Sequence, residues 1–222
     1  PTSQTVALLV KGQDRRFLHL FGANAGLTVA HMDRDWLRTL DIFYLGGLYV
    51  LPGIDMDAFG DMLRFCREQG VTTVVDVITP QSVSDFGGLR KILPHVDYFI
   101  PNEDEAARMT GGTTPREQIA VLQSWGAHTL VITQGGKGLT AAQGDKVWRA
   151  APFPVEAVDP SGGGDAFAAG LIYGIGSGWA LPEMLRYASA LGASATLAVG
   201  TTTSVFTRAQ AEAFLGEHGF GL

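Results

Sequence analysis

The chain has 222 residues, of which 46% are hydrophobic and 17% are charged, and its formal net charge is −6. This composition is that of a globular protein whose core needs no disulfides or metals to be stable. The acidic balance argues against a nucleic acid or an anionic membrane surface as partner, because both attract clustered positive charge. No apolar run approaches the roughly 20 residues that span a bilayer, and no signal sequence opens the chain. We therefore expect a cytoplasmic protein that acts on small molecules.

Cysteine and histidine usage excludes further classes. Cys66 is the only cysteine and lies in an amphipathic helical pattern, so intrachain disulfides and cysteine-rich metal sites are excluded. The five histidines are scattered without the spacing of metal ligands, which argues against a zinc site.

The first predicted element is a hairpin. Residues 5–10 and 16–21 are apolar runs on either side of a polar turn, a pattern typical of two antiparallel strands. A short helix is predicted within residues 31–40. The apolar run inside residues 41–53 is of the kind found in a strand buried on both faces.

Helices and strands alternate over the rest of the chain. The pattern predicts right-handed crossovers and an α/β fold with a doubly wound, mainly parallel sheet and flanking helices. A second hairpin is predicted around Gly144, and no linker marks a second domain. Helices are predicted at 56–69, 87–93, 103–110, 115–125, 163–178, 181–199 and 207–217, and strands within 72–77, 97–102 and 128–134.

The segment "DPSGGGDAF" places three glycines before an apolar helical pattern. Backbone N–H groups at a helix start lack intrahelical acceptors and lie at the positive end of the helix dipole. Gly162, Gly163 and Gly164 would let an anion approach those groups, and Asp165 could accept a proton from an attacking hydroxyl. A flexible turn followed by a dipole-compensating acid explains the same residues, so this segment alone leaves both interpretations open.

The segment "FIPNEDEA" follows a predicted strand and opens a helix. Asn102 and Glu105 have the spacing of a capping box, in which each side chain accepts a hydrogen bond from the other's backbone N–H. Alone, this pattern favours a helix cap over a metal site. The run Glu103, Asp104, Glu105 is nevertheless compatible with magnesium held partly through water.

The segment "LVITQGGKG" follows a predicted buried strand. A tight turn explains its glycines and is the favoured interpretation of this segment alone. The alternative is that the backbone at Thr133, Gly135 and Gly138 lies against a nucleotide.

Taken together, these three segments resemble the ribokinase-like (PfkB) family of carbohydrate and nucleoside kinases. "DPSGGGDAFAAG" is similar to the family's signature D-T-x-G-A-G-D and the small-residue helix after it. "NEDE" matches the family's N-x-x-E motif, and "VITQGGKG" resembles its nucleotide-binding turn. The order and spacing of the segments agree as well.

The resemblance implies ATP-dependent phosphoryl transfer to a hydroxyl of a small, sugar-like substrate. Asp165 would be the catalytic base, and Gly162, Gly163 and Gly164 would form the anion hole. Asn102 and Glu105 would act on Mg²⁺ and phosphates through water. The remaining implied residues are Thr133, Gly135 and Gly138 at the nucleotide, and Asp159 and Ser161 at a monovalent cation such as K⁺.

The chain departs from the family pattern in two ways. Pro160 stands where threonine is usual, which puts the monovalent-cation site in question. Gly163 stands where alanine is usual and should only loosen the anion hole. The family's opening segment, with its substrate-binding motifs, has no counterpart before Pro1. We therefore expect residues 1–222 to form one kinase domain without its N-terminal portion, with residues 5–21 as a remnant of the lid.

Several alternatives stay open at this stage. The substrate could be a nucleoside, or the chain could bind nucleotide without catalysis. A nicotinamide enzyme is disfavoured, because "GIGSG" at residues 174–178 does not follow a strand. Family members often dimerise through their lids, so a homodimer is a further expectation. The pattern does not show whether the apolar residues of the first hairpin face a core or an interface.

Overall fold

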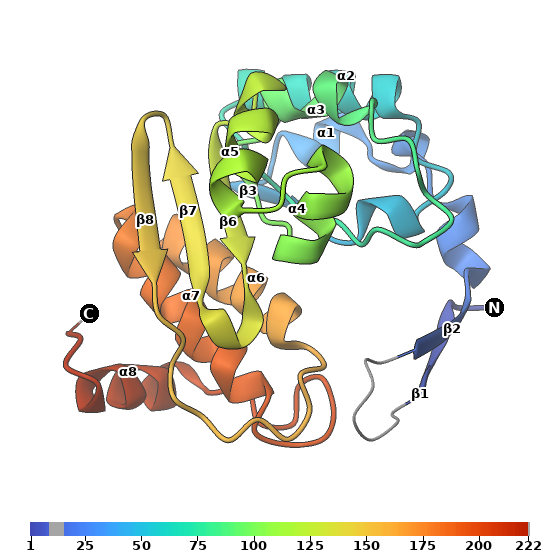
Figure 1. The fold of residues 1–222 in the computed structure, drawn as a ribbon. Helices are drawn as coiled ribbons and strands as arrows, with labels where there is room; N and C mark the ends of the chain where they lie inside the picture. Colours follow the sequence, from blue (N-terminus) through green and yellow to red (C-terminus); the bar gives the residue numbers. More distant parts are fainter. Residues whose placement is uncertain (9–15, 222) are drawn as a thin grey trace. The chain divides into compact units, whose positions relative to one another are not determined.

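The computed structural model describes residues 1–8 and 16–221 (Figure 1). The chain folds as two compact units. The first unit comprises Pro1–Asp97 and Leu122–Ala127, and the second comprises Tyr98–Val121 and His128–Leu222.

The first unit begins with the predicted hairpin. Strands β1 (Gln4–Leu8) and β2 (Arg16–Leu20) pair antiparallel, with Gln4 opposite Leu20 and Leu8 opposite Arg16. The turn expected at residues 11–15 lies outside the described residues. The side chains of Val6, Leu18 and Leu20 are 57%, 63% and 58% exposed, so this hairpin presents an apolar surface.

The rest of the first unit alternates helices and strands. Strands β3 and β4 pair in parallel, and the apolar side of α2 is buried. Asp55 caps α2, because its carboxylate accepts a hydrogen bond from the N–H of Ala58 at 2.9 Å. The elements are α1 (Arg34–Leu37), β3 (Ile42–Leu45), α2 (Met56–Glu68), β4 (Thr72–Val75) and α3 (Leu89–Ile92), with 3₁₀ turns at Gly22–Gly26, Val29–His31, Leu48–Val50 and Leu93–His95.

One expectation for this unit is wrong. Strand β3 was expected to be buried on both faces, yet only Phe43 and Leu45 are buried and Tyr44 is 36% exposed. The strand is short and turns at Gly46 and Gly47, so the apolar run after it forms a 3₁₀ turn instead of continuing the strand. Cys66 lies in α2 and is buried.

The second unit contains the remaining strands and helices, except that the last residues of α5 belong to the first unit. Strand β6 pairs in parallel with β5 and antiparallel with β7, and β7 pairs antiparallel with β8. Helices α6 and α7 lie together against one face of these strands (Figure 1). The elements are β5 (Tyr98–Phe99), α4 (Glu103–Thr110), α5 (Pro115–Ser124), β6 (Thr129–Thr133), the 3₁₀ turn Gly135–Lys137, β7 (Leu139–Gln143), β8 (Lys146–Ala150), α6 (Gly163–Gly176), α7 (Leu181–Ala195) and α8 (Arg208–Glu217).

The strand order is β3-β4 in the first unit and β5-β6-β7-β8 in the second, with parallel and antiparallel pairs and flanking helices. This confirms the predicted α/β class, including the second hairpin, which supplies the antiparallel strands. Helix α7 ends at Ala195, four residues before its predicted end. No helix among the described residues is long and apolar enough to cross a membrane.

Candidate functional site

The start of α6 is shaped by Gly162. This residue has a φ of +79°, a left-handed conformation that glycine adopts without strain. A Cβ at this position would lie 2.2 Å from the carbonyl oxygen of Thr201, so the backbone after α7 presses directly on the glycine loop. The backbone conformation and the contact with Thr201 therefore account for the presence of glycine at position 162.

The next two glycines differ in their surroundings. A Cβ on Gly163 would meet the carbonyl oxygen of Gly192 at 3.4 Å, which is ordinary contact, so alanine would fit there as in the family signature. A Cβ on Gly164 would meet nothing within 4 Å. Neither packing nor backbone conformation therefore requires glycine at position 164.

Asp165 lies in the first turn of α6 and is exposed. Its carboxylate makes no hydrogen bond or ion pair with any residue that the structure describes. The N–H groups of this first turn have no acceptors within the helix. An exposed acid thus stands beside backbone donors at the positive end of a helix of 14 residues.

Small residues fix the position of α6 against α7. A Cβ on Gly170 would lie 2.7 Å from the Cα of Ala188, and one on Gly174 would lie 2.8 Å from the side chain of Met184. The two helices therefore pack with their backbones unusually close. This packing holds the start of α6 in place while its exposed side stays open.

Asp159 organises the loop before α6. Its side chain is buried, and its two carboxylate oxygens accept hydrogen bonds from the N–H of Ser161 at 2.9 Å and of Gly200 at 3.2 Å. Pro160 lies between Asp159 and Ser161 in the sequence. Its carbonyl oxygen accepts a long hydrogen bond from the N–H of Gly163. The proline is thus accommodated within an ordered loop.

Asn102 and Glu105 form the predicted capping box at the start of α4. The Asn102 side-chain oxygen accepts from the N–H of Glu105 at 2.8 Å, and the Glu105 carboxylate accepts from the N–H of Asn102 at 2.9 Å. Burial raises the pKa of the Glu105 carboxyl to about 7, although the hydrogen bond from Asn102 opposes this shift. Glu105 therefore carries a carboxyl group that titrates near neutral pH.

The turn after β6 lies beside this cap. Asn102 forms an isolated parallel bridge with Thr133, whose N–H donates to the carbonyl oxygen of Pro101 at 3.1 Å. Gly135 has a φ of +54° and open space around it, whereas a Cβ on Gly138 would lie 2.0 Å from the carbonyl oxygen of Ala150. Gly138 is therefore required by the hairpin, and the surface at Gly135 is free.

Glu103 connects the cap to this turn, a role that the sequence analysis missed. Its carboxylate accepts a hydrogen bond from the side-chain amide of Gln134 at 3.1 Å and pairs with the ammonium of Lys137 at 3.0 Å. Gln134 also accepts from the hydroxyl of Thr140 at 3.0 Å. The partners are more than 30 positions away, so no local pattern could have identified them.

No three His, Cys, Asp or Glu side chains among the described residues gather into a ready metal site. Mg²⁺ in proteins is commonly held by one or two carboxylates, several waters and the phosphates of a substrate. The single carboxyl of Glu105 fits that arrangement, in which the nucleotide supplies most of the ligands. The buried carboxylate of Asp159 is likewise compatible with a nearby cation.

The described contacts form two groups. Asn102, Glu105 and the Thr133 turn are joined through hydrogen bonds and the bridge, with Glu103 between them. Asp159, Ser161 and Gly162 are joined through the segment at Gly200 and Thr201. Both groups lie in the second unit.

Comparison with known proteins now decides the family. The model of the pfkB family of carbohydrate kinases matches residues 1–208. This chain belongs to the pfkB family. The glycine loop before α6 and the N-x-x-E segment therefore lie in a member of a kinase family.

Individual pfkB relatives are similar over different parts of the chain. The ribokinase of Haemophilus influenzae is 26% identical over 224 residues, which cover 98% of this chain and 70% of that protein. The cytidine kinase of Thermococcus kodakarensis is 42% identical over 100 residues, 44% of this chain. The chain spans 36% of that cytidine kinase, so the alignment covers only part of each protein.

A solved pfkB-like structure confirms the fold. The ribokinase of Arabidopsis thaliana, complexed with ribose and ATP, superposes with a TM-score of 0.79 at 23% identity. The alignment covers 97% of this chain and 69% of that one. The ribokinase-like architecture predicted from the sequence is therefore correct.

Proposed function

We propose that this protein is an ATP-dependent kinase that phosphorylates a hydroxyl group of a small sugar. The observation that carries the proposal is the contrast between Gly162 and Gly164. Gly162 is explained by its φ and by Thr201, but Gly164 has open space and no strained backbone. Glycine at an exposed first-turn position costs up to about 1 kcal/mol relative to alanine, so a ligand that lies against the backbone accounts for it.

The residues at the start of α6 supply what the transfer needs. The substrate oxygen forms a bond to the γ-phosphorus of ATP while the bond from that phosphorus to the departing ADP oxygen breaks. The proton of the substrate hydroxyl passes to the carboxylate of Asp165. Backbone N–H groups of the loop Gly162–Gly164 stabilise the negative charge on the phosphoryl oxygens.

The second group of residues would hold the nucleotide. Thr133, Gly135 and Gly138 would lie along it, and Asn102 and Glu105 would face its phosphates and Mg²⁺ through water. Mg²⁺ neutralises phosphate charge in such sites. Asp159 and Ser161 are proposed as neighbours of a monovalent cation, which a comparison of turnover in K⁺ and in tetramethylammonium buffers would test.

The substrate class is tested directly by a panel assay. The purified protein is incubated with ATP, Mg²⁺ and single pentoses, hexoses or nucleosides, and ADP formation and the phosphorylated product are measured. A sugar is expected to give the highest kcat/KM. Similarity to a cytidine kinase makes a nucleoside the second candidate, which the same panel separates.

A non-catalytic role is the alternative from another class. Calorimetry with ATP and Mg²⁺, run beside the panel, distinguishes it. Tight nucleotide binding without any phosphorylated product would favour a nucleotide-binding regulator over the kinase.

We further propose that the hairpin β1–β2 forms a homodimer contact. Val6, Leu18 and Leu20 are more than half exposed, and such an apolar strand surface is commonly covered by a partner. Replacing Leu18 and Leu20 with serine is expected to shift the protein to monomer in sedimentation experiments. An unchanged sedimentation coefficient would remove the hairpin from the interface.

A further inference from the structure

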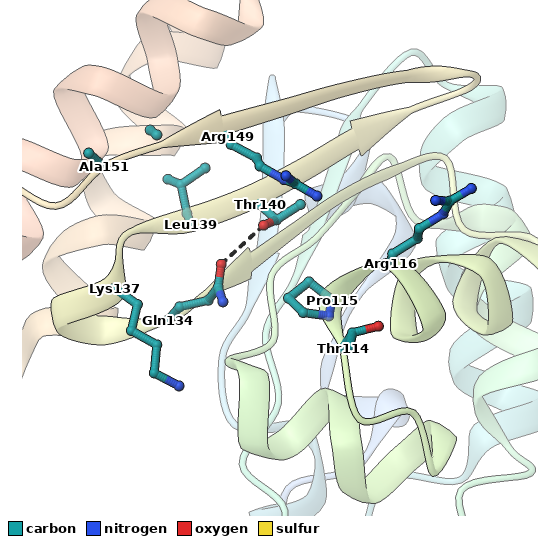
Figure 2. A pocket seen from close by; sticks show the side chains of 10 residues that line it. Thr114, Pro115, Arg116, Gln134, Lys137, Leu139, Thr140, Arg149 and Ala151 are labelled. Carbon is teal, nitrogen blue, oxygen red and sulfur yellow. Dashed lines mark hydrogen bonds between the residues drawn. The ribbon is translucent and has the colours of Figure 1, made fainter.

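A pocket of 380 Å³ lies between the first turn of α5 and the strands β7 and β8 (Figure 2). It contains none of the residues proposed for catalysis at the start of α6. Of the described residues that line it, Arg116, Lys137 and Arg149 are basic and none is acidic. Lys137 is paired with Glu103, so the positive charge offered to a ligand comes from the two arginines, in contrast to the net charge of −6 of the whole chain.

The two arginines come from different elements. Arg116 is in the first turn of α5 and Arg149 is on β8. Neither side chain makes a hydrogen bond or an ion pair with a residue that the structure describes. Figure 2 shows the side chain of Arg149 extending past Thr140 toward α5, whereas the side chain of Arg116 extends from α5 away from Arg149. Both residues line the pocket. Unpaired guanidinium groups that share a pocket favour a phosphate, which each can bind through two parallel hydrogen bonds.

The other lining residues suit a small molecule with both polar and apolar parts. Thr114 and Thr140 provide hydroxyl groups, and Gln134 provides an amide. Pro115 and Leu139 add apolar surface. A pocket of this size and composition is matched to a compact, hydroxylated molecule with one anionic group.

We propose that this pocket binds a small phosphomonoester, with its phosphate between Arg116 and Arg149. The inference goes beyond the proposed kinase activity, because it rests on residues that the transfer does not use. Gln134 and Lys137 belong both to the pocket and to the turn after β6. A ligand in the pocket would therefore contact the turn that we propose for the nucleotide.

The test is a titration of the ¹⁵N-labelled protein followed by NMR. The probes are ribose 5-phosphate, ribose and sulfate, each in a separate titration. Saturable shifts of the amide signals of Thr140, Ala150 and Ala151 are expected with ribose 5-phosphate, and none with ribose. Ribose 5-phosphate is expected to bind at least about tenfold more tightly than sulfate, because the sugar fills the rest of the pocket.

Charge-removing variants then locate the site. Arg116→Gln and Arg149→Gln are each expected to weaken binding by about tenfold or more. Lys146→Gln is the matched control, since Lys146 is also exposed on β8 but does not line the pocket. The proposal is overturned if the three amides do not shift at millimolar ribose 5-phosphate, if sulfate binds equally well, or if both arginine variants bind like the control.

The same spectra separate this inference from the proposed function. The amide signals of Gly164 and Asp165 report on the start of α6, and those of Ala150 and Ala151 report on the pocket. If the amides of Ala150 and Ala151 do not shift, those of Gly164 and Asp165 still report on binding at the start of α6. The reverse also holds.

Discussion

The backbones of Gly162 and Thr201 are in direct contact, and a Cβ on Gly162 would lie 2.2 Å from the carbonyl oxygen of Thr201. The φ of +79° at Gly162 adds strain for any other residue. Gly162→Ala is therefore expected to lower the free energy of unfolding by roughly 2 kcal/mol or more. Urea denaturation followed by circular dichroism measures this change. A loss below about 0.5 kcal/mol would contradict the contact.

Gly164→Ala is expected to have opposite effects on stability and activity. Alanine fits the open space at this position and is expected to raise the free energy of unfolding by about 0.5–1 kcal/mol. The added methyl group would obstruct the phosphoryl group, so we expect kcat to fall by at least about tenfold. Both quantities are measured on the same preparation.

Gly163→Ala is the matched control for that variant. The methyl group would make only ordinary contact with Gly192, so stability is expected to hold or rise and activity to persist. Full activity in Gly164→Ala would show that no ligand approaches this backbone.

Glu103 is expected to position the nucleotide turn through Gln134 and Lys137. Lys137 is 75% exposed, so the ion pair contributes at most about 1 kcal/mol to stability. Glu103→Ala removes both contacts and is expected to raise the KM for ATP several-fold, whereas Glu103→Gln keeps an acceptor for Gln134 and should have a smaller effect. Asp104→Asn removes the same charge from the same helical turn and serves as the control. Equal KM values in Glu103→Ala and in the control would rule out this role.

Stability of the ligand-free protein is expected to depend on the ionisation of Glu105. Burial raises the pKa of its carboxyl to about 7 in the folded state, against about 4.3 in an unfolded chain. Between these pH values the folded state keeps a proton that the unfolded state has released. The free energy of unfolding therefore falls as the pH rises through this window, by a few kcal/mol at most.

The Glu105→Gln variant isolates this titration. Glutamine has the same shape and cannot ionise, so its urea denaturation should depend less on pH between about 4 and 7 than that of the parent protein. Identical pH profiles for the two proteins would assign the dependence to other groups.

Much of this fold could be predicted because its elements carry local signals. The spacing of Asn102 and Glu105 predicted the capping box, and α4 begins and ends where the pattern indicated. The hairpin around Gly144 was equally clear, since a polar turn separates two apolar runs. In both cases the stabilising contacts join residues a few positions apart.

The parts that could not be predicted depend on contacts between distant residues. The family resemblance implied that Gly162 belongs to an anion hole, but only the structure shows that the backbone of Thr201 leaves no room for a side chain at this position. The pairing of Glu103 with Lys137 and the meeting of Arg116 with Arg149 at one pocket have no periodic signature either. Such sites arise when the fold brings together side chains that each have an ordinary explanation in sequence.

The central claim is that Asp165 removes the proton from the substrate hydroxyl, and Asp165→Asn tests it most directly. Asparagine keeps the shape of the side chain but cannot accept the proton, and Asp145→Asn in the turn between β7 and β8 is the matched control. Turnover with ATP, Mg²⁺ and the preferred substrate is expected to fall by about 10²–10⁴-fold, with the KM for ATP changed only slightly. Turnover within a few-fold of the parent protein would contradict the proposed role of Asp165.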